Sequence, residues 1–265
     1  MAYALLGEHL SHSLSVPVHR KIREKAGLPS DYVLREIPRE RFEKDIAGIL
    51  REYEGVNVTI PYKQDVIPYL DELSPEAEAV GAVNTVVREG DRLKGYNTDI
   101  RGFQVMLEEA GVPGGIPVWI LGTGGASVAV RRALTESGFT EIHSVSRDPA
   151  KGEPYSSLDS HFSGLLVNCT PVGMYPDAES CPLTAETLNK ILPRARAVLD
   201  LIYNPVKTVL LKAAEDRGIP AVNGMVMLTA QAIASEALWN KASDAGLSYS
   251  VVLVKGNQEA SICAK

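Results

Sequence analysis

Short runs of β-branched and apolar residues alternate with longer stretches of helical period along most of the chain. This alternation is typical of parallel sheets whose strands are joined by crossover helices. In the first hundred residues the pattern predicts three strands, two helices, a further helix started by Pro61, and a hairpin around a Gly90-Asp91 turn. The strands are Tyr3–Gly7, Tyr32–Ile37 and Gly55–Thr59, the helices are Pro17–Ala26 and Arg39–Arg51, and the hairpin joins Val83–Val87 to Leu93–Tyr96.

A glycine-rich break at Gly111–Gly115 precedes a second series of elements. The expected strands are Ile116–Leu121, Glu141–Val145, Gly164–Asn168, Ala197–Ile202 and Ile219–Val222. The expected helices are Ile100–Glu109 before the break and Ser127–Ser137, Val206–Arg217 and Met225–Trp239 after it. We expect Tyr155–His161 to form a surface loop and the tail from Ser243 to pack back on the first unit.

The chain has 265 residues, which is close to the upper size for one hydrophobic core. We therefore expect one large α/β domain or two domains around a cleft. Its 27 Lys and Arg residues against 33 Asp and Glu give a net charge of −6, which argues against nucleic-acid or anionic-membrane partners. A composition of 45% hydrophobic residues excludes general disorder.

The N-terminal residues lack the pattern of a secretory signal, and no run approaches the ~18 apolar residues of a membrane span. The three cysteines, Cys169, Cys181 and Cys263, are scattered, which argues against a disulfide scaffold and a zinc site. A cytoplasmic location is therefore expected.

The segment Gly122-Thr123-Gly124-Gly125-Ala126-Ser127 joins a predicted strand to a predicted helix, which is the context of a dinucleotide-binding turn. Glycines allow a tight turn there, and the free N–H groups of the helix start face a pyrophosphate. Ser127 stands where a third glycine would be. The alternative is a glycine-rich connection that binds no ligand.

The end of the next predicted strand carries Ser146, Arg147 and Asp148, in the region where NAD enzymes place an acidic residue. Arg147 can hold a 2′-phosphate through two charge-assisted hydrogen bonds, which favours NADP over NAD. Asp148 opposes this because a carboxylate repels a phosphate, whereas Lys151 restores positive potential. A solvated surface arginine is the alternative.

Polar residues also gather at predicted strand ends in the first hundred residues. Ser13 and Ser15 alternate on an extended segment before a helix, so both hydroxyls point the same way and favour a carboxylate pocket. The alternative for Ser15 is a helix cap. Lys63 and Asp99 lie beside other predicted strand ends, and such strand ends line the ligand crevice in open α/β sheets. Taken alone, a lysine is usually solvated and an aspartate before a helix is usually a helix cap.

Taken together, these segments resemble the ordered motifs of the shikimate dehydrogenase family over nearly the whole chain. The matching segments are Gly7 with Ser11–Ser15, Asn57–Lys63, Gly81–Thr85, Gly95–Asp99, Gly122–Ser127, Asn168–Met174, Asp200–Pro205 and Gly224–Gln231. The resemblance implies a two-domain enzyme that reversibly reduces 3-dehydroshikimate to shikimate with NADPH. Residues 1–101, completed by about 229–265, would bind substrate, and residues 102–228 would form a Rossmann-like NADP-binding domain.

The resemblance also implies roles for individual residues. Ser13 and Ser15 would hold the substrate carboxylate with help from Thr59, and Tyr203 would lie near it. The ring hydroxyls would be bound by Lys63, Asn84, Asp99 and Gln231. The nicotinamide side would be lined by Thr170, Ile202, Gly224 and Met227, and the rest of the cofactor would meet Gly122, Thr123, Gly124, Gly125, Ala126, Ser127, Ser146, Arg147 and Lys151.

The expected chemistry suits these residue types. Reduction of a ketone requires a hydride on carbon and a proton on oxygen, so a titratable donor must reach that oxygen. Lys63 is the best candidate for that donor, and Asp99 would orient its ammonium group and share the proton, so that the two titrate as a pair. No metal is required.

Several positions depart from the family pattern. Ser146-Arg147-Asp148 replaces the usual Asn-Arg-Thr, His9 and Val16 replace prolines, and Arg20 replaces an asparagine. We expect His12 to orient its loop, His19 to lie on the first helix, and Cys169 to be a small buried residue.

Two rival functions stay open. One is an NAD-dependent quinate or dual quinate/shikimate dehydrogenase, and the other is a non-catalytic regulator that binds such metabolites. Retention of both Lys63 and Asp99 argues against the regulator. A homodimer is compatible with the sequence.

Overall fold

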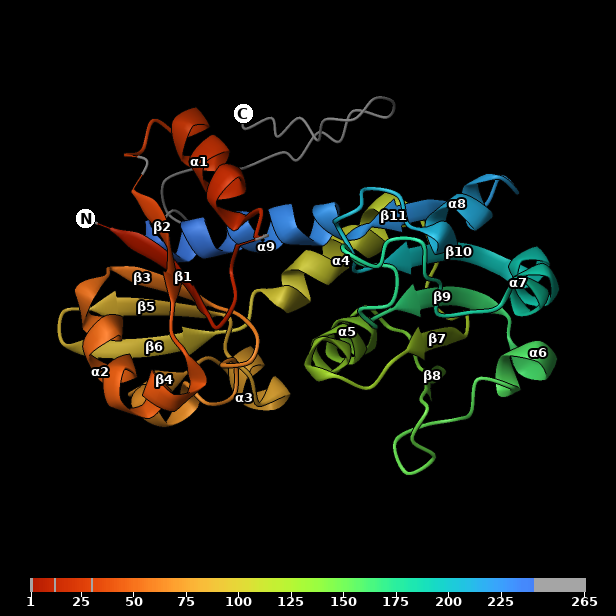
Figure 1. Ribbon diagram of the computed structural model, residues 1–265, viewed down its shortest axis with the longest axis horizontal. Helices are drawn as coiled ribbons and strands as arrows, with labels where there is room; N and C mark the ends of the chain where they lie inside the picture. Colours follow the sequence, from red (N-terminus) through yellow and green to blue (C-terminus); the bar gives the residue numbers. More distant parts are fainter. Residues whose placement is uncertain (1, 12, 30, 241–265) are drawn as a thin grey trace. The chain divides into compact units, whose positions relative to one another are not determined.

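The computed structural model describes residues 2–11, 13–29 and 31–240 (Figure 1). The chain divides into two compact units: unit 1 is Met1–Asp99 with Thr229–Lys265, and unit 2 is Ile100–Leu228. One boundary falls at the start of helix α4 (Asp99–Ala110) and the other inside helix α9 (Gly224–Trp239). The predicted packing of the tail from Ser243 lies outside the described residues.

The described part of unit 1 holds a six-stranded sheet of order β2-β1-β3-β5-β6-β4. Its strands are β1 (Tyr3–Gly7), β2 (Tyr32–Glu36), β3 (Gly55–Val58), β4 (Glu72–Leu73), β5 (Thr85–Glu89) and β6 (Arg92–Tyr96). Strand β1 is parallel to β2 and β3, whereas β5 is antiparallel to β3 and β6. This mixed sheet, with its β5–β6 hairpin, confirms the predicted α/β unit.

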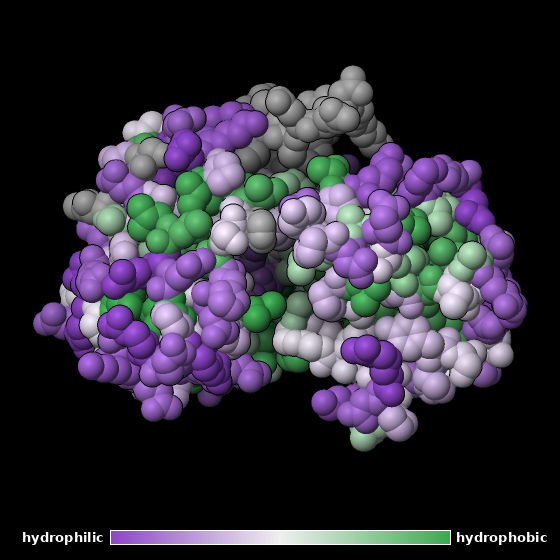
Figure 2. All heavy atoms as spheres, viewed as in Figure 1, coloured by the Kyte–Doolittle hydropathy of each residue, from purple (hydrophilic) through white to green (hydrophobic). Residues whose placement is uncertain are grey.

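The α-helices that lie wholly within the described part of unit 1 are α1 (Ser15–Lys25), α2 (Phe42–Glu52) and α3 (Pro75–Val80), and the unit also includes Thr229–Trp239 of α9. Helix α2 buries Phe42, Ile46, Ile49 and Leu50 in a core shared with β3 and β5, as its apolar spacing predicts. Its remaining face is polar, in keeping with the predominantly hydrophilic surface that Figure 2 shows over this part of the molecule.

The prediction of a helix that starts at Pro61 is wrong, because residues 60–66 form successive turns instead. The backbone N–H of Val83 donates to the carbonyl oxygen of Lys63 over 2.7 Å. This bond ties the segment to the start of β5 and uses a carbonyl that a continuing helix would need.

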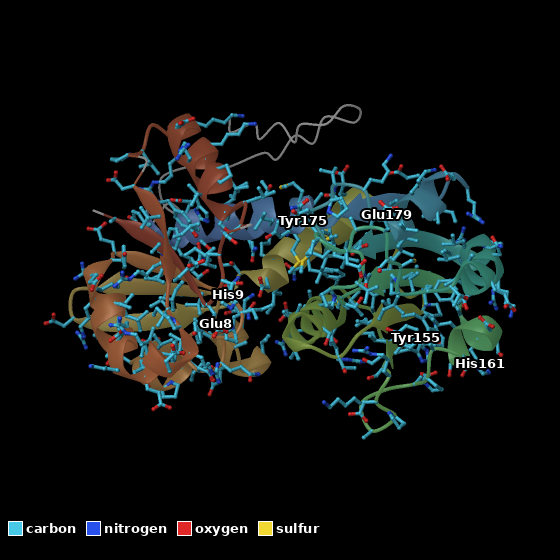
Figure 3. All side chains as sticks on the ribbon, in the orientation of Figure 1. Glu8, His9, Tyr155, His161, Tyr175 and Glu179 are labelled. Atoms are coloured by element: carbon cyan, nitrogen blue, oxygen red, sulfur yellow. The ribbon has the colours of Figure 1, made fainter. Side chains whose placement is uncertain are left out.

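Unit 2 is a five-stranded parallel sheet of order β11-β10-β9-β7-β8 with helices between its strands. The strands are β7 (Val118–Leu121), β8 (Ile142–Val145), β9 (Gly164–Asn168), β10 (Ala195–Asp200) and β11 (Ala221–Asn223). The helices besides α4 and α9 are α5 (Gly125–Glu136), α6 (Ser157–His161), α7 (Ala185–Ile191) and α8 (Val209–Glu215). Figure 3 labels Tyr175 and Glu179 on the loop between β9 and α7.

The prediction of a surface loop at Tyr155–His161 is wrong. Residues Ser157–His161 form α6 because Leu158 is fully buried in the core of unit 2, next to Phe162. A five-residue helix is too short to show a hydrophobic period in the sequence.

Among the described residues, no helix is long and apolar enough to cross a membrane. The same residues include no group of three or more His, Cys, Asp or Glu side chains able to hold a metal ion. Cys169 and Cys181 are free thiols.

Candidate functional site

Four chain segments meet at one edge of the sheet in unit 1. Strands β1 and β3 run parallel with Leu6 paired to Val58, so the loops that follow them leave the sheet together. Strand β5 begins at this edge, with Thr85 paired to Asn57, and β6 ends there, with Tyr96 paired to Thr85. Figure 3 labels Glu8 and His9 where the chain leaves β1 at this edge. The carboxyl ends of parallel strands are the usual place for a ligand in an open α/β sheet.

Lys63 and Asp99 form an ion pair at this edge. Lys63 Nζ lies 2.6 Å from Asp99 Oδ2. The Asp99 side chain is 7% exposed and the Lys63 side chain 27% exposed, so the carboxylate is enclosed while the ammonium group keeps access to solvent. This geometry allows the ammonium group to meet a ligand while the carboxylate orients it.

Asn84 connects this pair to two other elements. Its Nδ2 lies 3.0 Å from Asp99 Oδ1, 3.0 Å from Thr98 Oγ1 and 3.1 Å from Gln231 Oε1. Its Oδ1 accepts the backbone N–H of Thr98 over 2.8 Å. An amide group has two N–H donors, so these three acceptors share them. Lys63, Asn84, Asp99 and Gln231 therefore belong to one hydrogen-bonded network.

A buried polar layer, formed by Asn57 with Tyr32, Thr85 and Ser235, contacts this network through the backbone of Asn84. Asn57 Nδ2 lies 3.1 Å from the backbone oxygen of Asn84, 3.0 Å from Thr85 Oγ1 and 3.0 Å from Ser235 Oγ. Asn57 Oδ1 accepts the Tyr32 hydroxyl over 2.9 Å. Because Ser235 lies one turn after Gln231 on α9, the same helix face supplies both layers.

Ser13 and Ser15 form a second polar group in unit 1. Their Oγ atoms lie 3.1 Å apart, and the backbone N–H of Ser15 donates to Ser13 Oγ over 3.2 Å. Ser15 is the first residue of α1, and its hydroxyl does not cap the helix, so the capping alternative is wrong. Thr59 follows β3 close to Gly7, where a Cβ would lie only 2.7 Å from Thr59 Cγ2. His19 lies on α1 as expected, and His12 falls outside the described residues.

The glycine-rich turn lies at the corresponding edge of the sheet in unit 2. Gly122 has φ of +94°, and a Cβ there would lie 2.9 Å from Thr170 Cγ2. A Cβ at Gly124 or Gly125 would meet no atom of the described residues within 4 Å, and no described side chain caps the start of α5. The backbone at Gly124 and Gly125 therefore has open space beside it at a helix start without a side-chain cap, which fits a pyrophosphate.

The backbone N–H of Ser127 donates to the carbonyl oxygen of Gly124 over 3.0 Å. Its hydroxyl donates to the carbonyl oxygen of Gly124 over 2.6 Å, which turns the side chain back onto the backbone. Thr123 and Ala126 complete the turn, and Thr123 Oγ1 lies 3.5 Å from Ser146 Oγ.

Strand β8 ends beside the turn, with Val145 paired to Leu121. Ser146 Oγ accepts the backbone N–H of Asp148 over 3.1 Å. Lys151 Nζ lies 3.7 Å from Asp148 Oδ2, so a cation partly offsets that carboxylate. Arg147 is exposed next to these residues.

The ends of β9 and β10 are joined by a network that the sequence did not reveal. Asn168 Oδ1 accepts both the backbone N–H and the hydroxyl of Thr170, over 3.0 and 2.7 Å, and its Nδ2 donates to Asp200 Oδ1 over 3.0 Å. Asp200 also accepts the backbone N–H of Ile202 over 3.1 Å and the Thr208 hydroxyl over 2.7 Å. The network thereby fixes the backbone at Thr170 and Ile202.

Burial raises the pKa of Asp200 to about 6, against the lowering effect of its hydrogen bonds to Thr208, Ile202 and Asn168. Burial also raises the pKa of the Cys169 thiol, which is typical of a structural cysteine and not of an activated nucleophile.

The remaining predicted residues lie in unit 2. Tyr203 follows β10, and burial raises the pKa of its hydroxyl. Gly224 donates its N–H to the carbonyl oxygen of Ile202 over 3.0 Å, and a Cβ there would lie 2.0 Å from the Leu201 carbonyl oxygen. Met227 is buried on the first turns of α9. The roles of all these residues stay predictions.

Residues 5–86 match the family model described as the shikimate dehydrogenase substrate binding domain. The chain is 37% identical over 252 residues to the NADP(+) shikimate dehydrogenase of Clostridium beijerinckii. The aligned region covers 90% of this chain and 92% of the relative. The structure is similar to that of a chorismate mutase/shikimate 5-dehydrogenase fusion protein from Clostridium acetobutylicum, with 38% identity, a TM-score of 0.84 and 91% of each chain covered. It is also similar to the Thermus thermophilus shikimate 5-dehydrogenase in complex with NADP(H) and shikimate, with 34% identity, a TM-score of 0.82, and 91% of this chain and 94% of that chain covered.

Proposed function

The chain belongs to the shikimate dehydrogenase family, and from this premise we propose that it catalyses the reversible NADP-dependent reduction of 3-dehydroshikimate to shikimate in aromatic amino-acid biosynthesis. The observation that carries the proposal is the Lys63–Asp99 ion pair held in one network with Asn84 and Gln231. A pair of this kind supplies the proton chemistry that a ketone reduction requires.

Unit 1 would bind the substrate and unit 2 the cofactor. The family-model match falls within unit 1, which also holds the serine pair and the Lys63–Asp99 pair. The uncapped start of α5, the open space at Gly124 and Gly125, and Arg147 fit the phosphates of NADP. When bound, NADP exchanges a hydride with the reacting carbon of the substrate.

The protein side chains would handle the proton. In the reduction direction, Lys63 Nζ donates a proton to the ketone oxygen, and in the oxidation direction it accepts the hydroxyl proton. Asp99 Oδ2 holds the ammonium group in place, while Asn84 fixes the other carboxylate oxygen. Ser13 and Ser15 donate hydroxyl hydrogen bonds to the substrate carboxylate with help from Thr59, and Gln231 binds a ring hydroxyl.

The test is a spectrophotometric assay of the purified protein with shikimate or quinate as substrate and NADP or NAD as cofactor. The proposal predicts that the combination of shikimate and NADP has the highest kcat/KM. Absence of shikimate-dependent NADP reduction would contradict it and favour the non-catalytic regulator.

A second candidate is an NAD-dependent quinate/shikimate dehydrogenase, favoured by one observation. The carboxylate of Asp148 follows β8 in the region of the 2′-phosphate, and Lys151 compensates it only over 3.7 Å. Faster turnover of quinate with NAD in the same assay would support this candidate.

We also propose a cytoplasmic location, supported by the free thiols of Cys169 and Cys181, which suit a reducing compartment. A homodimer stays a prediction, which sedimentation analysis of the purified protein would check.

A further inference from the structure

A second cluster of titratable residues is buried in unit 1, on helices α1 and α9. Glu236, His19 and Arg23 are only 1%, 2% and 2% exposed. Glu236 Oε1 lies 2.8 Å from His19 Nδ1, and Glu236 Oε2 accepts Arg23 Nη1 over 2.7 Å. The proposed reaction gives none of these residues a role.

The cluster is electrically balanced. Burial lowers the pKa of His19 against the raising effect of Glu236, so the ring is neutral and its Nδ1–H donates to the carboxylate. Glu236 and Arg23 then carry one charge of each sign. Arg23 also donates Nε to the carbonyl oxygen of Pro29 over 2.5 Å, and its guanidinium carbon lies 4.2 Å from the ring centre of Tyr3. The guanidinium group is thereby held in one orientation.

The cluster connects two helices that both carry predicted substrate contacts. His19 and Arg23 lie one turn apart on α1, whose first residue is Ser15. Glu236 lies on α9, five residues after Gln231 and next to Ser235, which bonds to Asn57 over 3.0 Å. The apolar contacts of Val18 and Ile22 bury α1 but have no directional preference. Two hydrogen bonds from α1 to one carboxylate, in contrast, fix both the rotation of α1 and its position along the helix axis.

Stability alone does not account for this arrangement, because a buried ion pair usually stabilises a fold no more than well-packed apolar residues do. We propose that Glu236, together with His19 and Arg23, is a positioning residue that holds the Ser13–Ser15 pair in register with Gln231 and the Lys63–Asp99 pair. The cluster would thereby set the affinity for the substrate carboxylate. This inference rests on the proposed function.

The experiment compares His19→Ala, His19→Asn and Glu236→Gln in the full-length protein. Asparagine places an N–H donor close to the position of His19 Nδ1, so it can restore the bond to Glu236. The control is Ser74→Ala, which removes the cap of α3 in the same unit and lies on neither α1 nor α9. Each variant is assayed for the KM of shikimate, the kcat, the KM of NADP and the melting temperature, with the methyl ester of shikimate as a second substrate.

His19→Ala and Glu236→Gln are expected to raise the KM of shikimate about tenfold, the usual scale for a lost hydrogen bond to a charged group. The kcat and the KM of NADP should stay close to the parent values, and the ester should lose less kcat/KM than shikimate because it lacks the carboxylate charge. His19→Asn should restore the KM of shikimate. Ser74→Ala should lower the melting temperature but leave the KM of shikimate unchanged.

An unchanged KM of shikimate in folded His19→Ala would overturn the inference, as would an equal loss of kcat/KM for shikimate and its ester. If Glu236→Gln does not fold, the two His19 variants decide the question. Inactivity of the parent protein would remove the proposed function, and the inference with it, so the two failures are distinguishable.

Discussion

Asn84 Nδ2 lies 3.0 Å from Asp99 Oδ1, while the other oxygen of that carboxylate faces Lys63 Nζ over 2.6 Å. Both oxygens are therefore engaged, and the plane of the carboxylate is fixed. Asn84 itself is held by the backbone N–H of Thr98. The ammonium group is thus the partly exposed member of a rigid network, which is the arrangement that a proton donor to a bound ligand needs.

Removal of either serine hydroxyl should weaken substrate binding. Ser13→Ala and Ser15→Ala are each expected to raise the KM of shikimate about tenfold with little change in kcat, because the hydrogen bond to the carboxylate is lost in ground and transition states alike. Steady-state kinetics measures this. Ser180→Ala, in the loop before α7, serves as the control and should change neither value. An unchanged KM in both serine variants would remove the proposed carboxylate pocket.

Arg147→Ala should discriminate between the two cofactors. The variant is expected to raise the KM of NADP about tenfold or more, because a guanidinium contributes charge-assisted hydrogen bonds to a 2′-phosphate. The KM of NAD should stay the same because NAD lacks that phosphate. The control is Arg132→Ala, which removes an exposed cation paired with Glu136 on the last turns of α5. An equal increase of KM for both cofactors would assign Arg147 a different role.

Stability should depend on the ionisation of Asp200. Its pKa is raised from 3.8 to about 6 in the folded protein, so the folded state holds a proton that the unfolded chain has already lost. Stability therefore falls as the pH rises from about 4 to about 6, by on the order of 3 kcal/mol at about 1.4 kcal/mol per pKa unit.

The test of this pH dependence is Asp200→Asn, whose amide can accept from Asn168 and donate to Thr208. Melting temperatures of the parent and the variant are compared between about pH 4 and pH 7. The parent should lose stability relative to the variant as the pH rises. A constant difference would show that Asp200 does not titrate in this range.

Gly224→Ala should be destabilising. Its Cβ would lie 2.0 Å from the carbonyl oxygen of Leu201, so the backbone between β10 and α9 would have to move, at a cost of about 1–3 kcal/mol or more. Gly48→Ala is the matched control, because a Cβ on that exposed position of α2 meets no described atom within 4 Å. It should raise stability by about 0.5–1 kcal/mol. Thermal unfolding measures both, and equal melting temperatures of the two variants would show that the space at Gly224 is not restricted.

The sequence predicted the longer elements well because burial and hydrophobic period coincide in them. Strand β9 is found as expected over Gly164–Asn168, and α2 buries the four residues that its spacing selected. Short elements gave no such period. Helix α3 was missed although Ser74 caps it and Gly81 ends it in the left-handed conformation, and α7 was missed for the same reason.

The site was predictable in part. The proximity of Lys63 and Asp99, 36 residues apart, followed from family motifs and strand ends, and the structure places the two side chains in contact. The network of Asn168, Asp200 and Thr208 was not predicted, because its partners meet only through the register between β9 and β10. The contact between Glu236 and His19 was not predicted either, because the two residues are 217 positions apart in the chain.

The kcat of Lys63→Ala for shikimate oxidation with NADP tests most directly whether Lys63 is the proton donor. We expect kcat to fall by about 100-fold or more, the usual contribution of general acid–base catalysis, with NADP binding unchanged. Lys94→Ala, which removes another lysine of unit 1 that is paired with a carboxylate, that of Glu72, should retain the parent kcat. Normal turnover by Lys63→Ala would contradict the assignment of Lys63 as the proton donor.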